Sequence, residues 1–89
     1  MANKRILKRA INSICEELFV EAVAATLYGN DVHEDNADAL LTSILKMQSH
    51  YISRVSHPEP GIPANKYFKD LRSQFSSEAG EIIDQINNL

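Results

Sequence analysis

The fold is indicated most clearly by residues 63–88, which read PANKYFKDLRSQFSSEAGEIIDQINN. Apolar side chains recur there every three or four residues, the spacing of one face of an α-helix. This stripe consists of Phe68, Leu71, Phe75, Ala79, Ile82, Ile83 and Ile86, with Tyr67 at one edge. Pro63 suits the first turn, where a missing backbone N–H costs nothing. The stretch predicts an amphipathic helix over 63–88.

Two earlier segments have the same periodicity. Over 4–28 the stripe is Leu7, Ile11, Ile14, Leu18, Ala22 and Ala25, widened by Cys15 and Phe19. Gly29-Asn30 follows and predicts a left-handed stop. Over 36–55 the stripe is Ala37, Leu40, Leu41, Ile44, Leu45, Tyr51, Ile52 and Val55. Asp35 is the expected N-cap of this helix, and the proline-rich run 56–61 ends it.

Three such helices and no strand pattern predict an all-α domain over 1–89. Short connections favour an up-down-up three-helix bundle. A chain of 89 residues buries a thin core. The alternative is therefore an open helical arrangement completed by dimerisation.

Composition argues for a cytoplasmic protein. The net charge is −3 and gives no general attraction to nucleic acid or an anionic membrane. Glu16, Glu17 and Glu21 interrupt the place where a signal peptide needs an apolar run, and no segment has the length of a membrane helix. The single Cys15 has no partner for an internal disulfide.

The charges segregate along the expected bundle. One half contains all nine cations and only two acids, Glu59 and Asp70, for a formal charge of +7. The other ten acids lie in the opposite half or near the midline. We define the basic pole as Lys4, Arg5, Lys8, Arg9, Arg54, His57, Lys66, Lys69 and Arg72. It predicts an anion-binding surface for an acidic protein or nucleic acid, with chance segregation as the alternative.

A second surface lies on the first helix, opposite its main stripe. Val20, Val23, Ala24 and Leu27 follow the i, i+3, i+4, i+7 spacing, so 19–28 is apolar nearly all round. We call these four residues the seam. They predict a dimer or partner interface, and the alternative is that the other two helices cover them within one subunit.

The sequence offers little for catalysis or metal binding. His33, Glu34, Asp35 and Asp38 match no ligand spacing, so no metal or other cofactor is expected. His50, Arg54 and His57 share one helix face, where cations near a helix C-terminus are the simpler explanation than an anion site.

Three further expectations concern buried groups and space. Cys15 flanks the core and is expected to be a buried, inert thiol. Tyr28, Tyr51 and Tyr67 are expected at the edge of the core, with their hydroxyls in water. A bundle of this size leaves little room for a pocket of roughly 300 Å³ or more.

These observations favour a small non-enzymatic protein-interaction module that forms a homodimer through the seam. The alternative function is binding of nucleic acid or an acidic partner at the basic pole. Neither a helix-turn-helix pattern nor aromatic residues interleaved with the cations support nucleic-acid recognition. An enzyme or a small-ligand binder is the least supported class.

Overall fold

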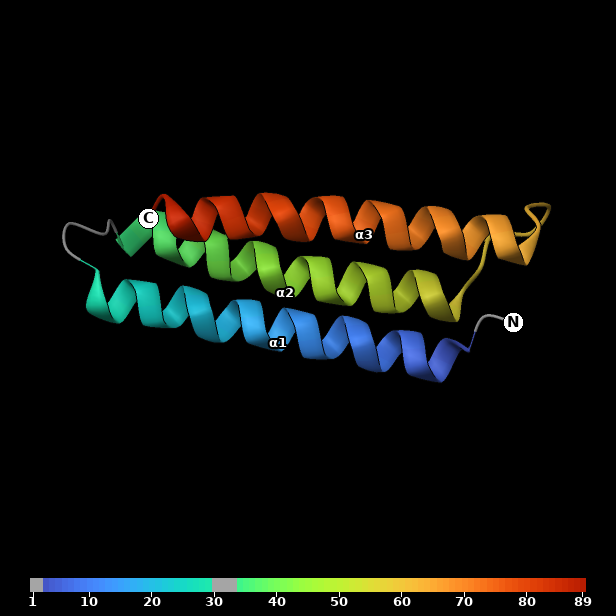
Figure 1. Ribbon diagram of the computed structural model, residues 1–89, viewed down its shortest axis with the longest axis horizontal. Coiled ribbons are helices and arrows are strands. Elements are labelled where there is room, and N and C mark those ends of the chain that lie inside the picture. The colour runs from blue at the N-terminus through green and yellow to red at the C-terminus, as the bar shows by residue number, and fades with distance from the viewer. Residues whose placement is uncertain (1–2, 30–33) are drawn as a thin grey trace.

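The protein is a bundle of three long helices in a computed structural model that describes residues 3–29 and 34–89. The helices are α1 (Lys4–Tyr28), α2 (Glu34–Ser56) and α3 (Ala64–Asn87). They run up, down and up, so that α1 and α3 point the same way and the chain ends lie at opposite ends of the bundle (Figure 1). The all-α three-helix prediction is confirmed. The Cα atoms span 48 × 19 × 16 Å.

The core runs along the inner faces of all three helices. Its buried residues come from α1 (Ile11, Cys15, Leu18, Ala22), α2 (Leu40, Ile44, Met47, Tyr51, Val55) and α3 (Tyr67, Phe68, Leu71, Phe75, Ala79, Ile82). In the part of the chain that the structure describes, every buried side chain of this core is apolar, a tyrosine or the cysteine. Burial of apolar surface at about 25 cal/mol per Å² therefore drives the packing.

The three helix pairs do not pack equally closely. Contacts between α1 and α2 are by far the most extensive, and those between α1 and α3 are the sparsest. Small side chains on the first pair, such as Cys15, Ala22 and Ala37, allow the backbones to approach. The large rings of Phe68 and Phe75 hold α3 further out.

A polar pair bridges α1 and α2. The Gln48 side chain donates from Nε2 to Oδ1 of Asn12 over 2.8 Å, in a half-buried position. The two helices are antiparallel, so this bond fixes which turns lie level with each other. Phe19, seven residues after Asn12, lies level with Leu41, seven residues before Gln48, and both pack against the core.

The predicted stripes are shifted relative to the observed core. Ile14, Leu45 and Ile83 were expected to be buried, but their side chains are 41%, 53% and 43% exposed. Met47 was not assigned to the stripe and is buried. Periodicity predicts a broad apolar face, but the neighbouring helices decide which edge of that face is covered. On α1 the close approach of α2 favours the Cys15 edge over Ile14.

Several helix ends differ from the prediction. Asp35 is not an N-cap, because α2 begins at Glu34; the capping position lies outside the described residues. Gly29 is extended, at φ −79° and ψ 146°, rather than left-handed, and its N–H donates to the Ala25 carbonyl. Asn30 lies outside the described residues. Pro63 precedes α3 as its N-cap, and the loop before it turns at Gly61 with a φ of 90°.

None of the helices, over the residues described, is long and apolar enough to cross a membrane.

Candidate interaction surfaces

The seam lies on the outer side of the C-terminal half of α1. Val20 and Leu27 are 65% and 71% exposed, whereas Val23 and Ala24 are half-buried. Neither α2 nor α3 covers the two largest aliphatic ends of the seam. Tyr28, which the sequence analysis did not include, is 86% exposed beside Leu27 and extends the apolar surface to the end of the helix.

The basic pole gathers at one end of the bundle. The start of α1, the end of α2 and the start of α3 meet there (Figure 1). Its exposed members are Lys4, Arg5, Arg9, His57, Lys66, Lys69 and Arg72; Lys8 and Arg54 are half-buried. The first turns of α1 and α3 contain no acid. The cations there oppose the helix dipoles, so the helices themselves do not explain them.

Arg54 is engaged inside the bundle rather than free at this pole. Its guanidinium lies 5.5 Å from the ring centroid of Tyr51 and 5.8 Å from that of Tyr67. Nη1 also donates to Oε1 of Gln74 over 2.6 Å. These contacts join α2 to α3, because a guanidinium stacks well on aromatic faces. Its side chain is thus largely committed to packing.

The backbone of Arg54 completes this junction. Its carbonyl belongs to the last turn of α2, where the usual donor four residues later is absent because position 58 is proline. The Tyr67 hydroxyl donates to this carbonyl over 2.8 Å instead. A side chain of α3 thereby caps the C-terminus of α2.

The face formed by His50, Arg54 and His57 does not assemble an anion site. His50 is exposed and lies edge-on to the Tyr51 ring, with centroids 5.1 Å apart. His57 is exposed beyond the end of α2. With Arg54 bound to Gln74, the three side chains have separate surroundings.

The buried titratable groups are held in their neutral forms. Burial, with a smaller effect of Glu16, raises the pKa of the Cys15 thiol, so the prediction of a buried, inert cysteine is confirmed. Burial, followed by a side-chain hydrogen bond to Glu78, raises the pKa of Tyr51 to about 12. The prediction that the tyrosines flank the core with hydroxyls in water is wrong for Tyr51 and Tyr67, which are 1% and 7% exposed.

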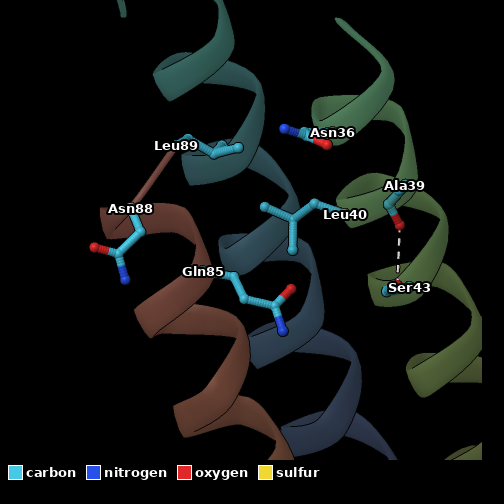
Figure 2. Close-up of a pocket in the computed structure, with 7 residues that line it drawn as sticks. All are labelled: Asn36, Ala39, Leu40, Ser43, Gln85, Asn88 and Leu89. Carbon is cyan, nitrogen blue, oxygen red and sulfur yellow. Dashed lines mark hydrogen bonds between the residues drawn. The ribbon is translucent and has the colours of Figure 1, made fainter. Parts of the chain in front are cut away.

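An open groove of about 370 Å³ lies between α2 and α3, at the end opposite the basic pole. Figure 2 shows Leu40 and Gln85 directed into the space between the helices. The other lining residues are Asn36, Ala39, Ser43, Asn88 and Leu89. The expectation that the bundle lacks a space of this size is wrong, although the lining contains no acid, base or thiol for catalysis.

A second, more apolar groove of about 260 Å³ separates α1 from α3. It is lined by Leu7, Ala10, Ile11 and Ile14 from α1 and by Leu71, Arg72, Phe75 and Ser76 from α3. The groove exists because these two helices touch least. Sequence analysis missed it, since both of its edges appeared to be core.

Neither a metal centre nor a known relative assigns a function. Within the described ranges, no three His, Cys, Asp or Glu side chains are grouped to hold a metal ion. His33 and the side chain of Glu34 lie outside the described part of the chain. No protein family, curated protein or solved structure matches this chain.

Proposed function

We propose that this chain is a small non-enzymatic protein-interaction module that forms a homodimer and offers the seam to a protein partner. The observation that carries the proposal is the apolar surface left uncovered on α1. Val20 and Leu27 expose about two thirds of their side chains on the side away from the core. Each fully buried aliphatic side chain contributes roughly 1.5–3 kcal/mol, so covering them favours association.

Charge supports a distinction between the two kinds of contact. Glu16, Glu17 and Glu21 are the charged residues that precede and intersperse the seam on α1, and all three are exposed. Two copies meeting at the seam bring these like charges together, whereas a partner with basic residues around an apolar centre complements them. The seam is thus proposed foremost as a partner surface, in its apolar centre and acidic rim.

The solution mass tests the homodimer. Light scattering is expected to give twice the 10.0 kDa of the chain at micromolar concentration and low salt. Repeating the measurement in about 0.5 M salt, where the Debye length falls to a few ångströms, separates an apolar contact from an ionic one. A mass near 10.0 kDa in both conditions overturns the proposed homodimer.

Anion binding at the basic pole is the second proposed function. Its support is the row of exposed cations at the starts of α1 and α3, where they oppose the helix dipoles. Binding to a fluorescent DNA or RNA pool is expected at low salt and to weaken steeply as salt rises. Lys66→Glu weakens such binding, and Lys46→Glu on α2, outside the pole, is the matched control. An absence of binding at low salt removes the nucleic-acid version and leaves an acidic protein.

A further inference from the structure

The face formed by α1 and α3 combines an apolar centre with exposed aliphatic side chains. Leu7 and Ile14 line its groove on α1, and Phe75 lines it on α3. Ile14 is 41% exposed, and Ile83, further along the same edge of α3, is 43% exposed. This α1/α3 face is the least closed side of the bundle, because α1 and α3 have the sparsest contacts.

Opposite charges flank this apolar centre at its two ends. On α1, Glu17 and Glu21 continue the edge that Ala10 and Ile14 begin, at the three-and-four spacing of a helix face. On α3, Lys69 precedes the groove-lining Arg72 by three residues. All four charged side chains are exposed. The face is therefore basic at one end and acidic at the other.

These charges are too far apart to neutralise each other within one chain. The groove brings Leu7–Ile14 of α1 level with Leu71–Ser76 of α3, an offset of about 63 positions between the two parallel helices. Arg72 thus lies level with about position 9, some eight residues before Glu17. At 1.5 Å per residue the two are about 12 Å apart along the bundle.

A two-fold rotation makes this face complementary to itself. With the axis at Ile14, an antiparallel second copy brings its own Ile14 onto the first. The same operation sets Leu7 opposite Ile83 of the second copy, because Ile83 lies level with about position 20. Arg72 falls between Glu17 and Glu21 of the second copy. Apolar and charged groups match in the same register.

We propose that a second copy of this chain docks antiparallel on the α1/α3 face, with Ile14 at the two-fold axis. The inference rests on the proposed homodimer and names its interface and orientation; the seam stays on the outside for another protein. The axis lies near the middle of α1, so the bundles overlap for about 30 Å across two helices, on the order of 600 Å² per subunit. That area is close to the lower limit of a specific interface, so the dimer is dissociable.

Charge reversal tests the orientation. Arg72→Glu and Glu17→Arg are each expected to weaken dimerisation at least about tenfold in sedimentation velocity, because each change occurs twice in a symmetric dimer. The double variant Arg72→Glu/Glu17→Arg restores the attraction and is expected to recover dimerisation. The wild-type dimer is expected to weaken as salt rises. Both side chains are exposed, so circular dichroism should show an unchanged helical fold.

Three more variants separate this inference from the proposed function. Ile14→Asp places two like charges at the axis and is expected to give monomer. Leu45→Glu, at an exposed apolar position of α2, and Leu27→Glu, in the seam, are expected to leave the dimer intact. Loss of the dimer in Leu27→Glu but not in Arg72→Glu overturns the α1/α3 interface and retains the homodimer. A monomeric wild-type chain overturns both.

Discussion

Replacing Tyr67 by phenylalanine tests the junction between α2 and α3. The substitution keeps the ring that packs in the core and removes only the hydroxyl that donates to the Arg54 carbonyl over 2.8 Å. Because position 58 is proline, the last turn of α2 has no backbone donor of its own for that carbonyl. The change therefore leaves a half-buried acceptor without its protein partner.

The magnitude follows from the cost of an unpaired acceptor. Loss of one net hydrogen bond costs about 1 kcal/mol, and leaving a partly buried carbonyl unsatisfied raises this toward 2 kcal/mol. For a domain of 89 residues, 1 kcal/mol shifts Tm by roughly 4–8 °C. Tyr67→Phe is thus expected to lower Tm by about 5–15 °C.

Thermal and urea unfolding, followed by circular dichroism at equal protein concentration, measure this effect. Tyr28→Phe is the matched control, because Tyr28 is 86% exposed and its hydroxyl faces water. The control should change the free energy of unfolding by less than about 0.5 kcal/mol. If the two variants unfold alike, the Tyr67 hydroxyl does not cap α2 and the reasoning fails.

Three other measurements probe the core, an ionisable group and the glycines. Ile44→Ala, at a fully buried position, is expected to cost about 2–5 kcal/mol, whereas Leu45→Ala should cost well under 1 kcal/mol; equal costs in urea unfolding would contradict the observed face of α2. Tyr51 has a folded-state pKa of about 12 against 10.0 in the unfolded chain, so its contribution to stability is complete below pH 10 and is lost as pH rises from 10 to 12, by up to about 1.4 kcal/mol per pH unit. Tyr51→Phe should flatten this alkaline slope, and an unchanged slope would assign it to other groups. Gly80→Ala meets open space in a helix and should stabilise the fold by about 1 kcal/mol, while Gly61→Ala, at a φ of 90°, should destabilise it by about 1–2 kcal/mol; the same sign for both would contradict the local geometry.

The three-helix fold was predictable because its signal is periodic and local. The predicted first helix, 4–28, coincides with α1, and the proline-rich run ends α2 at Ser56. Helix spacing, however, defines an apolar sector without saying which part of it a neighbour covers. The contrast between buried Cys15 and exposed Ile14 on adjacent positions of α1 is decided by the third dimension.

The contacts that join the helices were less predictable for the same reason. Arg54 appeared to be an exposed cation, because nothing local in the sequence places Tyr67, thirteen residues later, against it. Pro58 did carry a signal, since a proline four residues after a helical carbonyl removes that carbonyl's backbone donor. The groove between α1 and α3 depends on interhelical distances that no single helix encodes.

The bond between Asn12 and Gln48 has a consequence for alignment. Aliphatic side chains are interchangeable enough that α1 and α2 sliding by one turn, about 5.4 Å, would still bury a similar amount of hydrocarbon. The same slip would strand two amides in half-buried positions without each other. The pair therefore penalises misaligned packings more than it strengthens the native one, and its removal should leave a stable bundle with less uniquely ordered helices.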